Sequence, residues 1–120
     1  MCAGLNEDAA EIFRNNKAKG FHEKEANVGE LLMLITSELS EALEAHRNGR
    51  FASGHLMAPS YATWKEWFEK NYKDTFEDEI ADAVIRLLDL SALRGIDLEK
   101  HIQEKIKYNK LRPQLHGKQY

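Results

Sequence analysis

Apolar residues recur at every third or fourth position along most of this chain, which is the spacing of one face of an α-helix. No long stretch alternates apolar and polar residues with the period of two that is typical of a β-strand. The pattern predicts five helical segments, over residues 5–18, 27–48, 61–72, 75–94 and 97–111. We therefore expect an all-α protein, a bundle of four to five helices in a single domain spanning residues 1–120.

Residues that favour helix ends lie at several of these boundaries. Thr75 and Asp97 are expected N-caps, and Gly20 and Gly49 stand where the first two helices should end. Residues 49–74 then form an insertion, a loop followed by a short aromatic helix, between the two long helices. We expect those two long helices to pack as antiparallel neighbours.

The two long helices share one chemical feature, a pair of acidic residues three positions apart. Glu38 and Glu41 form the first pair, and Glu79 and Asp82 form the second. Residues three apart face the same side of a helix, so two packed helices can bring all four carboxylates together. Acidic pairs at this spacing also occur elsewhere in the chain, so the spacing alone also fits a solvated helix surface.

The surroundings of these residues favour a metal site. Residues 25–45 contain five glutamates and no lysine or arginine, and Arg86 is the one basic residue from Phe76 to Leu93. Crowded carboxylates beside apolar residues repel one another and lose solvation, and a divalent cation removes both costs. Mg²⁺ prefers such oxygen ligands, and we expect it here, with Mn²⁺ as a substitute. No Glu-x-x-His motif for a di-iron centre is present, and the ligands for a Cys/His zinc site are lacking.

The sign of the charge reverses towards the end of the chain, where residues 112–120 form a basic tail. Lys105, Asn109 and Arg112 fall at positions i, i+4 and i+7, on one face of the last helix. Ammonium, amide and guanidinium groups together are typical of phosphate binding. Cations also stabilise the C-terminal end of a helix. Taken without the acidic residues, these three residues therefore also fit a solvated helix end. A metal–polyphosphate ligand explains the acidic and the basic residues together.

Composition and charge narrow the class of protein. The net charge of −3 argues against a general nucleic-acid binder. No apolar run approaches the length of a membrane span, and the N-terminus lacks the features of a signal peptide. One cysteine, Cys2, fits a reducing compartment. We expect a cytoplasmic protein that binds neither membranes nor nucleic acid.

These motifs resemble those of the MazG-like, all-α nucleoside triphosphate pyrophosphohydrolases. The likeness covers residues 21–118 and consists of SELSEALEA, EDEIADAVIRLLDL, GIDL and KIKYNKLRPQLHGK. It implies the all-α NTP pyrophosphatase fold and Mg²⁺-dependent hydrolysis of a nucleoside triphosphate to the monophosphate and pyrophosphate. A deoxynucleotide with a pyrimidine base is the favoured substrate, and nucleotide-pool housecleaning is the implied role. The resemblance implies metal ligands at Glu38, Glu41, Glu79 and Asp82 and phosphate contacts at Lys105, Asn109 and Arg112.

Two features depart from the family's motif. Ser37 stands where the commoner motif has another glutamate, which leaves open the number of metal ions. It also leaves open whether Glu38 or Glu41 acts as the general base. The 49–74 segment is longer than usual.

Four aromatic residues are candidates for the base and sugar pocket. Phe21 and His22 resemble an F-H pair near the nucleotide pocket of relatives that act on deoxycytidine triphosphates. Trp64 and Trp67, on the insertion, can offer stacking surfaces. Aromatic residues at helical spacing also fit a core or a subunit interface, so both interpretations stay open.

The 75–94 helix is apolar around much of its circumference, which predicts a homodimer or homotetramer that completes the core. Two other functions remain open. One is a non-catalytic helical module for nucleotide sensing or protein interaction. The other is hydrolysis of a different pyrophosphate compound, such as a dinucleotide or a nucleotide sugar.

Overall fold

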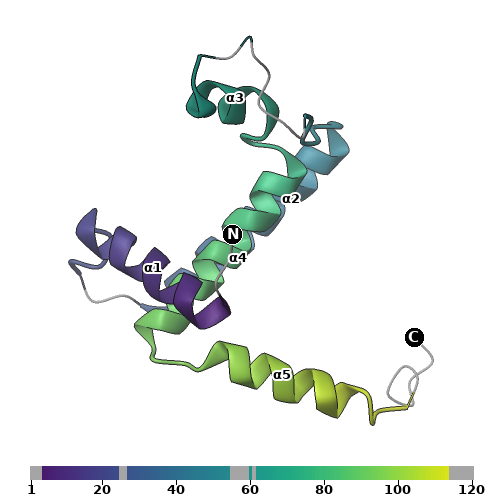
Figure 1. The fold of residues 1–120 in the computed structure, drawn as a ribbon. Helices are drawn as coiled ribbons and strands as arrows, with labels where there is room; N and C mark the ends of the chain where they lie inside the picture. Colours follow the sequence, from purple (N-terminus) through teal and green to yellow (C-terminus); the bar gives the residue numbers. More distant parts are fainter. Residues whose placement is uncertain (1–3, 25–26, 55–59, 61, 114–120) are drawn as a thin grey trace.

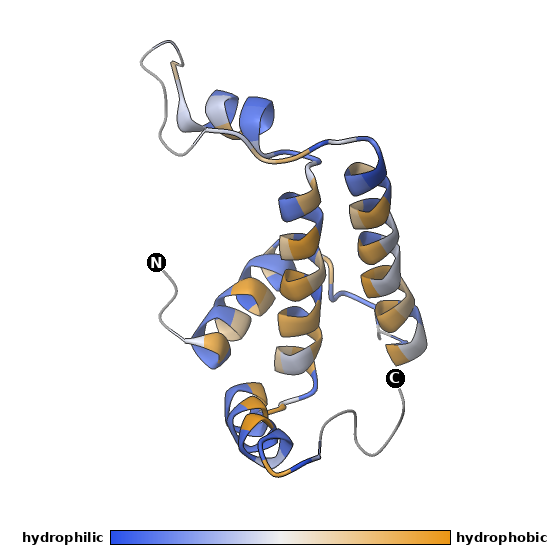
Figure 2. Ribbon diagram, turned by 90° about the vertical axis from the view of Figure 1, so that its right-hand side faces the viewer, coloured by the Kyte–Doolittle hydropathy of each residue, from blue (hydrophilic) through white to orange (hydrophobic). Residues whose placement is uncertain are grey.

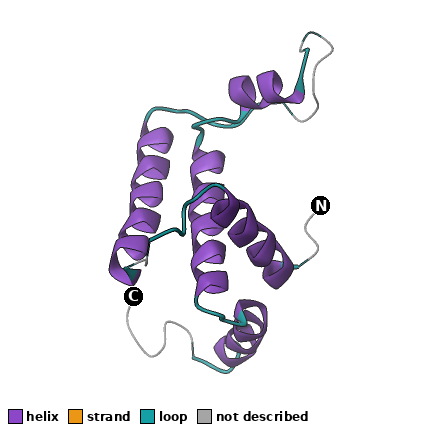
Figure 3. Cartoon of the chain, turned by 90° about the vertical axis from the view of Figure 1, so that its left-hand side faces the viewer, coloured by secondary structure: helices purple, strands orange, loops and turns teal. Residues whose placement is uncertain are grey.

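The computed structural model describes residues 4–24, 27–54, 60 and 62–113, and the regular structure in these ranges is entirely helical (Figure 1, Figure 3). The helices are α1 (Leu5–Ala18), α2 (Val28–Arg47), α3 (Trp64–Asn71), α4 (Phe76–Leu93) and α5 (Leu98–Asn109). The all-α class is confirmed, while α3 and α5 are shorter than the predicted 61–72 and 97–111. Cys2 and most of the basic tail, 114–120, lie outside the described residues. Within the described ranges, no helix has the length and apolar character that crossing a bilayer requires.

Three helices, α2, α4 and α5, each begin after a residue whose side chain caps the helix. The side chain of Thr75 accepts a hydrogen bond at 3.2 Å from the backbone N–H three residues later, and Asp97 does the same at 3.2 Å. Asn27 caps α2 in the same way, at 3.1 Å. Past the end of α2, Gly49 adopts a φ of 68°, in the left-handed region that favours glycine.

Three helices form the core. α2 and α4 pack side by side as an antiparallel pair, and α1 packs against α4 (Figure 3). The antiparallel direction, as predicted, is fixed where the Phe76 N–H donates to the Arg50 carbonyl at 2.9 Å. The buried apolar side chains of the three helices are mostly small: Ala9, Ile35, Ala42, Ala45, Ala83 and Leu88. This core is narrow, and most large apolar side chains of α2 and α4 remain partly exposed.

α3 and α5 project from opposite ends of this core (Figure 1). α5 is attached at its start, where the Leu5 N–H donates to Glu99 Oε1 at 2.8 Å, and none of its side chains is buried. α3 is held by its own loop through a bond of 3.0 Å from the Ser53 N–H to the Asn71 carbonyl. The Cα radius of gyration is 17.5 Å, compared with about 14 Å for a compact domain of this length. A single chain is therefore unusually open.

Both α2 and α4 are rich in hydrophobic residues (Figure 2), and several of these residues are partly exposed. Leu39 and Leu43 on α2, and Val84 and Leu87 on α4, are each 43% to 52% exposed. Their spacing of three or four residues places each pair on one helix face. We call these four residues the exposed apolar stripes.

Candidate metal centre

The structure brings three of the four predicted ligands to one point between α2 and α4. One carboxylate oxygen from each of Glu38, Glu41 and Glu79 lies within 4.8 Å of the other two. Glu38 and Glu79 are 8% and 6% exposed, whereas Glu41 is exposed. Asp82, one turn beyond Glu79, is half-buried beside them. These four residues are the acid cluster.

Glu79 has the most perturbed chemistry in the cluster. Burial raises its pKa, and the neighbouring carboxyl groups of Glu41 and Glu38 raise it further, to about 8. Its Oε2 atom is buried and has no hydrogen-bond partner among the described residues. A buried oxygen without a partner costs free energy, and a divalent cation is the kind of partner that carboxylate oxygens suit.

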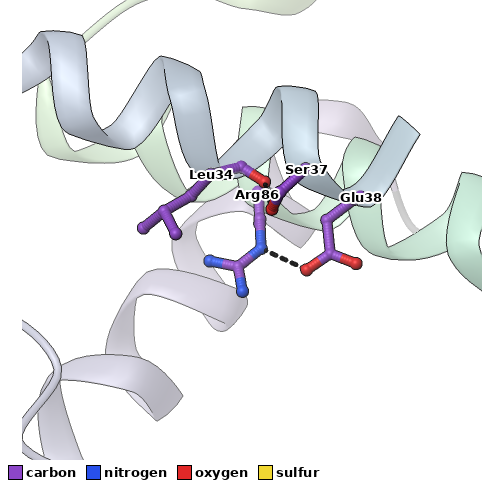
Figure 4. A network of polar contacts seen from close by, with 4 residues as sticks. All are labelled: Leu34, Ser37, Glu38 and Arg86. Atoms are coloured by element: carbon purple, nitrogen blue, oxygen red, sulfur yellow. Dashed lines mark hydrogen bonds and ion pairs between the residues drawn. The ribbon is translucent and has the colours of Figure 1, made fainter. Parts of the chain in front are cut away.

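The other buried carboxyl groups differ in the direction of their pKa shifts. Burial raises the pKa of Asp82, and nearby carboxylates raise it further. Burial also raises the pKa of Glu38, but the hydrogen bond from Arg86 and the neighbouring carboxyl groups of Glu79 and Glu41 outweigh that effect, so its pKa lies below the usual value. Arg86 Nε donates to Glu38 Oε1 at 2.8 Å (Figure 4). Glu38 is therefore held ionised while Glu79 is held protonated near neutral pH.

Ser37 occupies the position where the resembled motif has a glutamate. Its hydroxyl donates to the Leu34 carbonyl at 2.6 Å, within the same helix (Figure 4). Ser37 thus satisfies its own polar group and adds no ligand to the acid cluster.

Two pockets adjoin the acid cluster, and Asp82 lines both. The His22 pocket has a volume of about 340 Å³. Its polar lining consists of Asn16, His22, Glu38, Asp82, Arg86 and Asp89. The Trp64 pocket, of about 360 Å³, is lined by residues of α3, of the start of α4 and of the turn between them, including Trp64, Phe68 and Asp78. Both volumes lie in the range of small-molecule sites.

The predicted pair Phe21 and His22 lines the His22 pocket. His22 packs against Phe13, with 4.9 Å between ring centroids. Its Nε2 lies 3.0 Å from both carboxylate oxygens of Asp89. An ionised carboxylate can only accept, so Nε2 carries the proton. Asp89 thereby fixes the orientation of the imidazole.

The two tryptophans of the insertion have different environments. Trp64 is 63% exposed and lines the Trp64 pocket, with its ring centroid 5.3 Å from that of Phe68. Trp67 is 7% exposed and packs on Tyr72, at 4.7 Å between centroids. Of the two, only Trp64 offers a face to a ligand, and Trp67 fits the alternative interpretation of a core residue.

The predicted phosphate contacts lie away from the acid cluster within one chain. Lys105 and Asn109 are on α5 and Arg112 follows it, and none of the three lines either pocket. Lys105 Nζ and Arg112 Cζ lie 5.1 and 5.9 Å from the Tyr108 ring centroid, so both cations share one side of the helix. α5 leaves the core from the C-terminal end of α4, whereas the acid cluster lies in the first half of α4 (Figure 1).

Sequence reasoning missed Arg86 and Asp89 as site residues. A usable signal exists, because Asp82, Arg86 and Asp89 fall at i, i+4 and i+7 and must share one face of α4.

Comparison of the chain with models of known protein families, with curated proteins and with solved structures gave no match in any of the three. The resemblance to MazG-like enzymes therefore rests on the sequence motifs.

Proposed function

We propose that this protein is a nucleoside triphosphate pyrophosphohydrolase of nucleotide-pool housecleaning. It cleaves a nucleoside triphosphate, with a pyrimidine deoxynucleotide favoured, into the monophosphate and pyrophosphate. One observation carries the proposal: Glu38, Glu41 and Glu79 converge, and the buried Oε2 of Glu79 has no partner among the described residues. Carboxylates gathered beside a ligand-sized pocket suit a metal-bound polyphosphate. The motif resemblance supports the same reaction.

The donor set of the acid cluster fits Mg²⁺, with Mn²⁺ as a substitute. All four side chains offer hard oxygen ligands, and the groups with raised pKa values, Glu79 and Asp82, are those that gain most from a nearby cation. When bound, Mg²⁺ supplies positive charge that offsets the charge of the phosphates. A nucleotide-pool role places the enzyme in the cytoplasm.

We propose that Glu41 is the general base, which accepts a proton from the attacking water. Glu38 is bound to Arg86 and Glu79 is buried, so neither carboxylate is open to the attacking water. Glu41 is exposed at the edge of the cluster, where water reaches it. This assignment chooses between the two residues that the sequence leaves open.

The proposal includes a homodimer or homotetramer as the active form. The exposed apolar stripes and the radius of gyration of 17.5 Å support it, because a second copy can cover the stripes. Lys105, Asn109 and Arg112 keep their assignment as phosphate contacts in this form, where α5 of one copy approaches the acid cluster of another. Phe21 and His22 supply the base and sugar pocket, and Trp64 lines the separate pocket that shares Asp82 with it.

The test is a panel of dNTPs and NTPs with Mg²⁺ that resolves pyrophosphate from orthophosphate release. We expect pyrophosphate and monophosphate from the wild type, fastest with a pyrimidine dNTP. Glu79→Gln and Asp82→Asn should be inactive, while the exposed Glu11→Gln control should match the wild type. If no triphosphate is cleaved, the hydrolase proposal is wrong. Nucleotide binding without cleavage would then favour a non-catalytic sensing module. Cleavage of a dinucleotide or a nucleotide sugar would favour a hydrolase of that other class of pyrophosphate compound.

A further inference from the structure

Arg86 forms an ion pair with the acid cluster and has no role in the reaction as proposed so far. Its Nε lies 2.8 Å from Glu38 Oε1, and within the described ranges no other basic side chain forms an ion pair with the cluster. The Arg86 side chain is 43% exposed, whereas that of Glu38 is 11% exposed. The guanidinium is therefore anchored to a buried carboxylate and still reaches open space.

The ion pair uses one donor of the guanidinium. Arginine carries five N–H groups in a rigid planar fork, which suits phosphate and carboxylate oxygens. Only Nε is bonded to Glu38, and the two terminal nitrogens have no acceptor among the residues that the structure describes. In Figure 4 the dashed line to Glu38 starts from one nitrogen of Arg86, and neither of the other two nitrogens is joined to a labelled residue. Four N–H groups thus remain for an anion.

The position of Arg86 along α4 indicates which group of a bound nucleotide lies next to it. Asp82, Arg86 and Asp89 line one wall of the His22 pocket and span about 10 Å at the helical rise. The acid cluster lies at the Asp82 end of this wall, and the His22–Asp89 pair lies at the other. A nucleotide with its phosphates at the acid cluster and its base towards His22 brings its α-phosphate past Arg86.

We propose that Arg86 is a catalytic residue whose terminal N–H groups donate to a non-bridging oxygen of the substrate's α-phosphate. The inference rests on the proposed function and adds a contact made by the same chain as the acid cluster. During hydrolysis the water oxygen bonds to the α-phosphorus, and its proton passes to Glu41. The bond from the α-phosphorus to the bridging oxygen breaks, and pyrophosphate leaves with the electron pair. A guanidinium held against the α-phosphoryl oxygens stabilises the charge that they carry in this step.

The ion pair with Glu38 gives the fork its orientation before substrate arrives. A side chain already held in place loses less conformational entropy on binding. A purely structural Arg86 would act only by offsetting the charge of Glu38. If Arg86 had only that role, its substitution would change the affinity for Mg²⁺ and would have no specific effect at the α-phosphate.

The test compares the full chain with Arg86→Gln, Arg86→Ala and the control Arg94→Gln, using Mg²⁺ and the best dNTP. Arg94 is exposed at the end of α4 and lines neither pocket. We expect kcat of Arg86→Gln to fall on the order of 100-fold at saturating Mg²⁺ and dNTP, with Arg94→Gln unchanged. Added guanidinium, below denaturing concentration, should restore part of the rate of Arg86→Ala and none of the rate of Glu79→Gln. Circular dichroism checks that each variant is folded.

A second readout isolates the contact. Sulfur in place of one α-phosphate oxygen should slow the wild type more than Arg86→Gln for one of the two diastereomers, because the variant has already lost the contact to that oxygen. Equal sulfur effects, or full recovery of Arg86→Gln at high Mg²⁺, would overturn the inference and leave Arg86 acting through Glu38. A wild type that cleaves no triphosphate rejects the proposed function and this inference together. An active wild type with an equally active Arg86→Gln rejects the inference alone.

Discussion

The raised pKa of Glu79 makes the stability of the metal-free protein depend on pH in a defined direction. Burial and the carboxyl groups of Glu41 and Glu38 raise this pKa from a usual value of 4.5 to about 8. Between these values the folded protein holds a proton on Glu79, while the unfolded chain has lost it. Because the folded state binds more protons, the free energy of unfolding must fall as pH rises from about 5 to about 8, and level off above that.

Glu79→Gln, which is neutral at every pH, should remove this dependence. Each unit of pKa shift corresponds to about 1.4 kcal/mol. The full shift sets an upper limit, because the cluster opens to water beside the exposed Glu41, and water weakens the interaction between charges. We therefore expect the variant to be more stable than the wild type by about 2 kcal/mol at pH 9, and similar to it at pH 5.

Urea unfolding at several pH values, with a chelator present, measures the difference. Protein concentration must be held constant, since the stability of an oligomer depends on it. Glu11→Gln, exposed on α1, is the matched control and should follow the wild type at every pH. Mg²⁺ should reverse the order at pH 8, because a ligand at 100 times its Kd adds about 2.7 kcal/mol to the wild type and little to the variant. Parallel pH curves for the wild type and Glu79→Gln would refute the reasoning.

Three further predictions concern the fold and the assembly. Leu88→Ala opens a cavity in the narrow core and should lower the free energy of unfolding by about 2–4 kcal/mol in urea titrations; a loss under 1 kcal/mol would mean that the site collapses or is not core. Thr75→Ala removes the cap of α4 and should cost about 1 kcal/mol, with Thr75→Ser retaining most of it, and equal losses in both variants would argue against the cap. Leu39→Glu combined with Val84→Glu places charges in the exposed apolar stripes, so light scattering should show a smaller mass for the variant than for the oligomer proposed for the wild type. An unchanged mass would argue against an interface through the stripes.

The helices could be predicted from local sequence because their signals are local. Thr75 and Asp97 cap their helices through hydrogen bonds that span only three residues, and Gly49 ends α2 through its own backbone conformation. The positions of α3 and α5 could not be predicted in this way. Few side chains of either helix are buried, so no strong apolar pattern specifies where each one packs within the chain.

The site was predictable to the extent that it follows from helical periodicity. The i, i+3 spacing places Glu38 with Glu41 and Glu79 with Asp82, and the pairing of α2 with α4 brings three of these residues together. The bond from Arg86 to Glu38 depends on the register between two helices 48 residues apart in the chain. Periodicity within one helix carries no information about that register. His22 lies between α1 and α2, outside either helix, so helical periodicity does not place it beside Asp89 either.

The hydrogen bond between the Phe76 N–H and the Arg50 carbonyl has a consequence for how such a protein can diversify. It joins the two residues that flank the 51–75 segment. The end of α2 and the start of α4 are therefore held together independently of the path that the chain takes through α3. Doubling or halving the length of a closed segment changes its closure free energy by only about 0.6 kcal/mol. The segment nevertheless supplies Trp64 and Phe68 to the pocket beside Asp82. Evolution can therefore lengthen, shorten or replace this segment and so change the lining of that pocket, while the four carboxylates of the acid cluster stay in place.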